Sequence, residues 1–311
     1  MGLLSEFSHP TRWYSKLIAA SLALAFFTLL AGAIISGFVI YRIVAPTVIN
    51  ESIDIRTFPG HPEIVSYLVE GAMRDGWFFP GLKSAPTILL CSGYHATRGE
   101  LLPLATALQN QQYNVFLFDF GSQGASGTRS TMGFSEVREL RAAIAELAHR
   151  GDVDRTRFGL WGTNLGAYVA MAVAESDPRV RAIVVESVFD RPQDMVRLLV
   201  ARYGLAPLPL LPNLVEKGFL WVNYPYRETP PLSANLSRLA GVPKLFLSAS
   251  DQSDLVAPTH RLFVLAPEPK DEVLLARGNY AGMLDEEKRD YENRVVGFFL
   301  SNLPVSVGLQ Q

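Results

Sequence analysis

The stretch from residue 158 to residue 175 constrains the fold of this chain most. It consists of a short apolar run, a pair of closely spaced glycines and an alanine-rich segment, in direct succession. The apolar run is residues 158–161, the glycine turn is residues 162–166 (GTNLG), and the alanine-rich segment continues to Glu175. The apolar run predicts a buried strand, and the alanine-rich segment predicts a helix. Because glycine has no Cβ, the two glycines allow the strand and the helix to approach closely. The stretch therefore predicts a strand, a tight turn and a helix in succession.

The five-residue turn has the outline of a nucleophile elbow, in which G-x-S-x-G places a serine at the tip of a strained turn. The central residue of this turn is Asn164. An amide has no acidic proton to lose and is a very poor nucleophile. Asparagine is, however, one of the few non-glycine residues that tolerate positive φ, which such a turn requires. The sequence therefore predicts an elbow that keeps its shape and lacks its usual nucleophile.

The amino-terminal part of the chain carries an uncharged apolar run from Leu17 to Tyr41. As a helix, this run is long enough to cross the hydrocarbon layer of a membrane, which is about 30 Å thick. A cleaved signal peptide is the alternative, because residues 31–33 (AGA) resemble a small-residue cleavage site. The run continues past that site to Ile40, which favours an uncleaved single-pass anchor after a tail, residues 1–16.

Positive charges on both sides of the apolar run bear on its orientation. Arg12 and Lys16 precede the run, and Arg42 and Arg56 follow it. Under the positive-inside rule this distribution favours an amino terminus inside the cell. We therefore expect the large domain to lie outside the cytoplasm.

The composition excludes several classes of function for this chain of 311 residues. Lys and Arg number 28 against 30 Asp and Glu, and no basic stripe indicates a nucleic-acid partner. The single cysteine, Cys91, excludes an internal disulfide and a CxxC metal or redox site. No cluster has metal-ligand spacing, and the glycine-rich loop at residues 121–127 lacks the lysine of a P-loop. We expect neither a cofactor nor a metal.

After the anchor, short apolar runs alternate with helical patterns, which predicts one α/β domain at residues 52–304 with a doubly wound, mostly parallel sheet. Turns are expected at residues 59–60 and 75–76. Strands are expected at residues 53–58, 64–79, 86–91, 115–118, 158–161, 180–184, 244–247 and 272–275, and helices at 97–111, 134–149 and 286–300. Residues 190–240 are apolar and rich in proline. They are either a lid-like insertion over a ligand site or a packed helical excursion.

Several motifs in this domain occur in an order that resembles the α/β-hydrolase superfamily, most closely membrane-anchored bacterial members of the serine-aminopeptidase and esterase type. The motifs are residues 87–93 (TILLCSG), 119–126 (DFGSQGAS), 131–136, 162–166, 248–258 and 278–284. The resemblance implies the fold of that superfamily. It also implies oxyanion-hole-like positions at Gly93, Tyr94 and Leu165. The chain departs from the family pattern at Ser92, where histidine is usual, and at Gly121, where arginine is usual.

The resemblance also implies a catalytic triad in the chain order serine, acid, histidine. At these positions the chain has Asn164, then Asp251 or Asp254, then Tyr280. A phenol, whose pKa is about 10, cannot act as a general base at neutral pH. Two of the three groups are therefore missing, and we predict that the triad is not intact.

Other reactive side chains close to these motifs are candidates for a substitute. His95 follows the turn at Gly93 and could replace the missing base. Cys91 lies within or at the end of a strand, so we expect a buried and inert thiol. Asp119 ends a strand-like run, and we expect it to accept hydrogen bonds from loop amides.

The sequence supports three hypotheses for function. The first is a non-catalytic or strongly altered relative that binds an acyl-type ligand or a protein partner. The second is an active ester or amide hydrolase with an unconventional constellation, such as His95 with Asp251 or Asp254. The third treats Asn164 as the precursor of an aspartate nucleophile, as in dehalogenase-like members of the fold, although Tyr280 leaves no base to hydrolyse the ester.

Overall fold

The computed structural model describes residues 13–45, 53, 55, 58, 60–123, 127–278 and 280–305. The chain separates into two compact units. The smaller unit comprises Met1–Ile43 and Val196–Arg227, and the larger unit comprises Val44–Met195 and Glu228–Gln311. The predicted strand at residues 53–58 falls largely outside the described residues.

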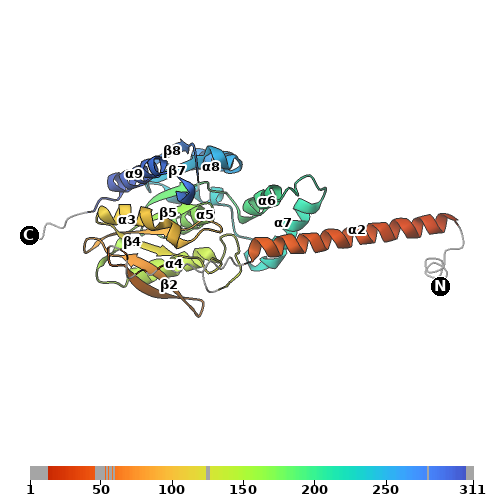
Figure 1. Cartoon of the computed structure of the whole chain (residues 1–311), viewed down its shortest axis with the longest axis horizontal. Coiled ribbons are helices and arrows are strands. Elements are labelled where there is room, and N and C mark those ends of the chain that lie inside the picture. Colours follow the sequence, from red (N-terminus) through yellow and green to blue (C-terminus); the bar gives the residue numbers. More distant parts are fainter. Residues whose placement is uncertain are drawn as a thin grey trace, which may run out of the picture. The chain divides into compact units, whose positions relative to one another are not determined.

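The larger unit is built on one eight-stranded sheet with the spatial order β1-β2-β4-β3-β5-β6-β7-β8 (Figure 1). The β1–β2 and β2–β4 pairs are antiparallel, and the remaining pairs are parallel. The strands are β1 (Glu63–Val69), β2 (Ala72–Phe79), β3 (Ala85–Cys91), β4 (Asn114–Phe118), β5 (Val153–Thr163), β6 (Val180–Glu186), β7 (Lys244–Ala249) and β8 (Lys270–Leu275). The predicted mostly parallel sheet is confirmed.

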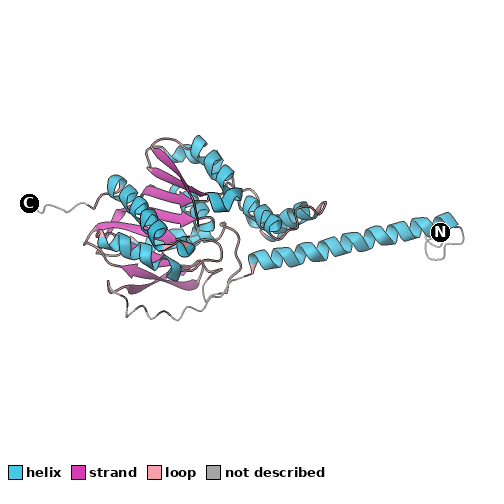
Figure 2. Cartoon of the chain, turned by 45° about the horizontal axis from the view of Figure 1, so that its top comes forward, coloured by secondary structure: helices cyan, strands magenta, loops and turns pink. Residues whose placement is uncertain are grey.

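Helices cover both faces of this sheet (Figure 2). Ile88 and Leu90 of β3 belong to one buried cluster with Leu104 and Phe299 of the helices on the first face. Leu89 lies between them and points to the second face, because side chains alternate along a strand. Burial of both faces explains why the central strands read as continuous apolar runs. The helices of the first face are α3 (Leu102–Asn110) and α9 (Asp285–Asn302); α4 (Glu136–Leu147) packs on α5 (Leu165–Ala174), and α8 (Ser253–Leu265) packs on β7 and β8.

The hairpin at the edge of the sheet turns at a different place from the one predicted. Glu70 and Gly71 connect β1 to β2 with φ values of 49° and 86°. Positive φ at both central residues is typical of tight hairpin turns. The predicted turn at residues 75–76 is wrong, because both residues lie within β2. Gly76 instead gives room to the ring of Phe116, which a Cβ at that position would overlap.

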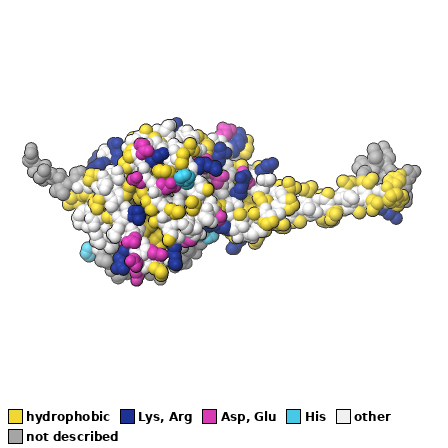
Figure 3. Space-filling view, turned by 90° about the horizontal axis from the view of Figure 1, so that it is seen from above, with side chains coloured by type: hydrophobic (Ala, Val, Ile, Leu, Met, Phe, Trp, Pro, Cys, Tyr) yellow, Lys and Arg dark blue, Asp and Glu magenta, His cyan; other side chains and the backbone are white. Residues whose placement is uncertain are grey.

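The smaller unit contains α2 (Trp13–Val44), α7 (Leu211–Val222) and the last part of α6 (Pro192–Arg202). Exposed hydrophobic side chains cover much of α2 (Figure 3). The helix is long and apolar enough to cross a membrane, as a signal sequence also is. It is longer than the predicted run because Lys16 and Arg42 are good helix formers. It ends before Pro46, since proline disfavours helical backbone at the preceding residue.

Residues 190–240, predicted as a lid-like insertion, are mainly helical. Besides α6 and α7 they form the short 3₁₀ helices η3 (Tyr224–Tyr226), η4 (Leu232–Ala234) and η5 (Leu236–Leu239). Only Val196–Arg227 belong to the smaller unit, and the flanking residues belong to the larger unit. A lid function for this segment stays a prediction.

Candidate functional site

The glycine turn connects β5 to α5 in the centre of the sheet, and its shape depends on both glycines. A Cβ at Gly162 would overlap the backbone of Gly166, and a Cβ at Gly166 would overlap the carbonyl group of Cys91. Asn164 lies between them with φ 37° and ψ -99°. This positive φ is the conformation for which asparagine was expected at the tip of the turn.

The side chain of Asn164 turns back onto the backbone around it. Its Oδ1 atom accepts a hydrogen bond of 2.6 Å from the N–H group of Tyr94 and another of 2.6 Å from the N–H group of Leu165. Because a backbone N–H group only donates, the oxygen and not the nitrogen of the amide must face these two groups. Two backbone donors from separate segments therefore converge on one oxygen atom.

The turn after β3 supplies one of these donors and is fixed by neighbouring polar groups. A Cβ at Gly93 would lie 2.9 Å from Nδ2 of Asn164, so glycine leaves space for the amide. The side chain of Gln123 donates to the carbonyl oxygen of Gly93 and accepts a hydrogen bond of 2.8 Å from Ser92 Oγ. The sequence analysis missed Gln123, although its place in the glycine-rich loop after β4 was a usable signal.

Tyr280 begins the short 3₁₀ helix η7 (Tyr280–Gly282) and is buried in the hydrophobic cluster that includes Leu104. Its hydroxyl donates a hydrogen bond to Glu292 of α9, and its ring centroid lies 5.4 Å from that of Tyr291. Burial, followed by the adjacent Glu292, raises the pKa of Tyr280 well above its ordinary value. The phenol is therefore neutral and contributes to the packing of α9.

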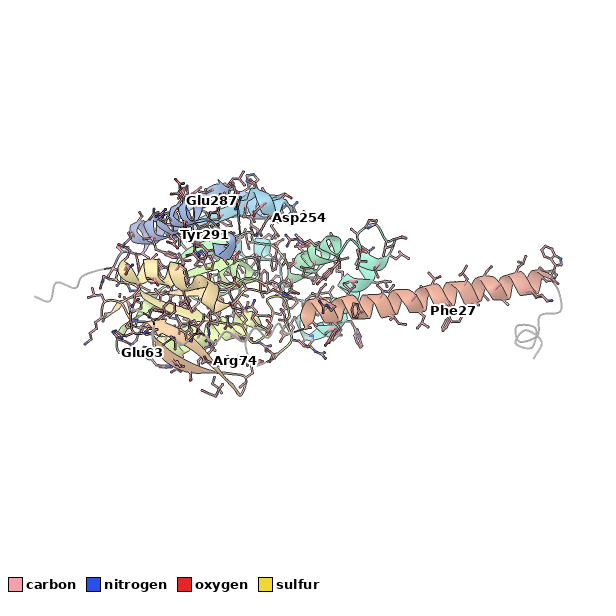
Figure 4. All side chains as sticks on the ribbon, in the orientation of Figure 1. Phe27, Glu63, Arg74, Asp254, Glu287 and Tyr291 are labelled. Carbon is pink, nitrogen blue, oxygen red and sulfur yellow. The ribbon has the colours of Figure 1, made fainter. Side chains whose placement is uncertain are left out.

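The two candidate aspartates differ in what they contact. Asp251 lies in the 3₁₀ helix η6 (Ser250–Gln252) directly after β7, and its Oδ1 atom accepts a hydrogen bond of 2.7 Å from the N–H group of Gly278. Asp254 is in the first turn of α8 (Figure 4). Asp251 therefore fixes the segment that leads into Tyr280, and which of the two aspartates is the equivalent of the family acid stays a prediction.

A buried acid that the sequence analysis missed lies beside the glycine turn. Glu186 ends β6, and its backbone carbonyl accepts a hydrogen bond of 2.8 Å from the N–H group of Asn164. Its carboxylate accepts a hydrogen bond of 2.7 Å from Tyr291, whose oxygen accepts one of 3.0 Å from Trp161. Burial, followed by the charge of Glu186, raises the pKa of Tyr291. The available signal was an acid two residues after the strand predicted at residues 180–184.

The remaining candidates, His95, Cys91 and Asp119, differ in their exposure and in the groups that they contact. His95 is exposed, has a φ of 62°, and its ring centroid lies 3.9 Å from that of Tyr94. Cys91 is fully buried, which raises the pKa of its thiol and keeps it protonated. Asp119 accepts a hydrogen bond of 2.7 Å from the N–H group of Arg98 and forms an ion pair with its guanidinium, as expected for a loop-stabilising acid.

A cavity of about 250 Å³ lies between the end of β8 and α9. Leu275 and Met283 line it together with Tyr291, and both Arg277 and Glu287 contribute charge. Because its lining carries both signs of charge, the cavity does not select an anion or a cation. Within the described ranges, no group of three or more His, Cys, Asp or Glu side chains is placed to hold a metal ion.

Comparison with known proteins adds independent evidence about the family. A family model described as serine aminopeptidase, S33, matches residues 83–226. The uncharacterized protein Rv2307c of Mycobacterium tuberculosis is 30% identical over 223 residues, which covers 70% of this chain and 71% of the relative. The uncharacterized protein YfhR of Escherichia coli O157:H7 is 26% identical over 249 residues, covering 75% of this chain and 78% of the relative.

Solved structures show the same fold at low sequence identity. An esterase of Pyrococcus furiosus superposes with a TM-score of 0.66 and 18% identity, over 84% of this chain and 98% of that chain. A dienelactone hydrolase of Anabaena variabilis superposes with a TM-score of 0.54 and 14% identity, over 78% of this chain and 99% of that chain. At these identities the similarity establishes the fold and not the activity.

Proposed function

The chain belongs to the α/β-hydrolase superfamily, and on that premise we propose that it is a membrane-anchored member that acts by binding and not by hydrolysis. The observation that carries this proposal is the position of Asn164 Oδ1, which accepts hydrogen bonds from the N–H groups of both Tyr94 and Leu165. The proposed ligand is an acyl-type molecule or a protein partner.

Acyl transfer on this fold needs a nucleophile, a general base and donors for the oxyanion. Asn164 supplies no nucleophile, and its own oxygen takes the two backbone donors that would otherwise face the oxyanion. Tyr280 supplies no base, because its proton is donated to Glu292 and its pKa is raised. Loss of the nucleophile or the histidine alone removes about 10⁶ of rate in serine hydrolases. With the donors also occupied, the arrangement supports even less residual catalysis.

The anchoring part of the proposal rests on α2. Its length and composition suit a membrane span. We propose that α2 stays uncleaved and that the larger unit lies outside the cytoplasm, as the flanking charges favour.

The proposal is tested on the purified full-length protein in detergent. A fluorophosphonate probe is expected to label no serine, and short acyl esters are expected to be hydrolysed at the rate of the buffer alone. Asn164→Ala is expected to raise that rate little, because it frees the N–H groups of Tyr94 and Leu165 but supplies neither a nucleophile nor a base. An active serine hydrolase added to the same sample serves as the control for the probe.

Two outcomes would instead support an active hydrolase. One is labelling of a serine whose replacement by alanine abolishes turnover. The other is measurable turnover that falls when His95 is replaced by alanine, which would indicate an unconventional constellation.

A further inference from the structure

The smaller unit has a second uncharged surface besides α2. Residues 203–215 (YGLAPLPLLPNLV), here called the apolar tip, join α6 to α7 and contain no charged side chain. The exposed fractions are 48% for Tyr203, 45% for Leu208, 68% for Leu210 and 40% for Leu214. Large apolar side chains that are contiguous and exposed mark a surface that meets another apolar phase.

The helix that follows the apolar tip packs on the carboxyl-terminal half of α2. A Cβ at Gly218 would lie 2.5 Å from Ile40 Cδ1 and 3.9 Å from Ser36 Oγ, and one at Gly32 would lie 3.7 Å from Leu214 Cδ1. Leu214 precedes Gly218 along α7, and its neighbour Gly32 precedes the neighbours of Gly218 along α2. The two helices therefore run in the same direction. The start of α7 therefore lies beside the middle of the apolar run, and not beside its end.

The depth of the apolar tip follows from helix geometry. The run from Leu17 to Tyr41 spans about 37 Å as a helix, and the hydrocarbon layer is about 30 Å thick. If the run is centred in the layer, Gly32 lies about 11 Å below the nearer boundary. Leu214 lies beside Gly32, and Leu210 precedes it by one helical turn. A membrane that contains α2 would therefore also contain the apolar tip.

Much of the backbone of the apolar tip is hydrogen-bonded within the protein or has no N–H group, which lowers the cost of placing it in a medium without water. The N–H groups of Tyr203, Gly204, Leu205, Leu208 and Leu214 all donate to carbonyl groups within the same segment or in α6. Three further positions of the tip are prolines, which have no N–H group to satisfy: Pro207, Pro209 and Pro212.

Aromatic side chains lie where the surface of such a membrane would be. Trp221 and Tyr224, which are 78% and 57% exposed, follow Gly218 and so lie near the level of Arg42 at the end of the apolar run. Tryptophan and tyrosine are enriched at the interface between membrane and water. The one acid of α7, Glu216, follows Leu214 by two residues and so lies about 8 Å below that surface, where its ion pair with Arg197 of α6 would pair the charge, as charges within membranes usually are.

We propose that the apolar tip is embedded in the hydrocarbon layer of the membrane beside α2, so that α6 and α7 form a hairpin that enters the bilayer without crossing it. The inference rests on the proposed anchoring by α2. It assigns residues 203–215 to lipid contact, and it predicts that the protein contacts its membrane through two segments that are far apart in the sequence.

The test uses the full-length chain with single added cysteines, since the native Cys91 is fully buried. Leu210→Cys probes the apolar tip, Phe27→Cys probes α2, and Leu68→Cys probes the larger unit; the three native side chains are 68%, 64% and 60% exposed. Each variant is labelled with an environment-sensitive fluorophore and reconstituted into vesicles of phosphatidylcholine and phosphatidylglycerol. Fluorescence is quenched either by nitroxide on the lipid acyl chain or by aqueous iodide.

The label at position 210 is expected to respond as the label at position 27 does, with strong quenching by acyl-chain nitroxide. Its iodide quenching should be several-fold weaker than that of the label at position 68.

Quenching of the label at position 27 by acyl-chain nitroxide, together with quenching of the label at position 210 by iodide, would overturn the inference and leave the anchor intact. Protection of position 210 from both quenchers would mean that protein covers the tip, which also overturns it. Absence of lipid quenching at 27 would overturn the anchor itself. A Leu208→Cys variant repeats the measurement if Leu210→Cys does not fold.

Discussion

The glycine turn and the segment around Tyr280 both lack the side chain that the family resemblance implies, yet they differ in the features that are present. At the turn, the two glycines, the positive φ of Asn164 and the converging N–H groups of Tyr94 and Leu165 are all present. Around Tyr280, the hydroxyl is bonded to Glu292 and the ring lies in the hydrophobic core. The backbone features that the resemblance implies are therefore present at the turn, whereas the position of the implied histidine is occupied by a side chain that packs in the core.

The largest effect is expected from the backbone of the turn. Gly166→Ala would place a Cβ against the carbonyl group of Cys91, which is part of the sheet and cannot rotate away. We expect a loss of about 3 kcal/mol or more in the free energy of unfolding, measured as a drop in Tm of the full-length protein in detergent. Gly297→Ala is the matched control, because its Cβ would meet nothing and alanine favours the helix by up to about 1 kcal/mol. Equal Tm values for the two variants would contradict a turn built on close backbone approach.

An intermediate effect is expected at Tyr280. Removing its hydroxyl should destabilise the protein more than removing the side chain of Asn164 does. Tyr280→Phe removes the donor to Glu292 in a buried setting and should cost about 1–3 kcal/mol. Asn164→Gly removes the amide but suits the positive φ, and replacing a helix cap by glycine costs only a few tenths of a kcal/mol. The Tm values of both variants are compared with that of Tyr203→Phe, a control at an exposed tyrosine. The reverse order of costs would show that the turn and not the Tyr280 segment depends on its side chain.

The smallest effect, counted per pH unit, is a pH dependence on the side of the turn. Glu139 accepts a hydrogen bond of 2.7 Å from the N–H group of Gly121, in the loop whose Gln123 holds Gly93. Burial raises the pKa of Glu139 to about 7, from an ordinary value of about 4.5. Between these values the folded state binds more protons than the unfolded state, so stability falls as pH rises.

The measurement for this prediction is Tm as a function of pH between 5 and 7.5, about the window in which Glu139 titrates. Glu139→Gln keeps an acceptor for Gly121 and should remove up to about 1.4 kcal/mol per pH unit of this decline. Glu175, whose pKa burial raises to about 8, contributes a decline of the same sign in both proteins. Identical pH profiles for the variant and the native chain would show that Glu139 does not titrate in this window.

The glycine turn and the sheet could be predicted from the sequence because local patterns specify them. A strand, two glycines and a helix lie within one short segment, and Asn164 at the tip is compatible with positive φ. The turn of the first hairpin was predicted wrongly, since Asp75-Gly76 is a more typical turn pair than Glu70-Gly71 by residue type, and strand pairing overrides that preference.

The polar partners of the site could not be predicted, because they are distant along the chain. Ser92 and Gln123 are separated by 31 residues, and Glu186 and Tyr291 by 105 residues. The partner of Tyr280 is closer, at 12 residues, but its identification required knowing that the phenol points into the packing of α9. Residue types indicate which groups need partners, and only the tertiary structure shows which partners they obtain.

The hydrogen bonds of Asn164 also bear on how any ligand could enter the turn. The amide oxygen is covalently attached to the segment that binds it, so it competes for the two N–H groups at a high effective concentration. A neutral ester carbonyl would exchange one acceptor for a similar one and gain little. A carboxylate or phosphonate, as a charged and therefore stronger acceptor, could displace the amide. Under the proposed binding role, we therefore expect Asn164 to compete with ligands for these N–H groups and to favour anionic molecules, such as the products of acyl hydrolysis, over the esters from which they form.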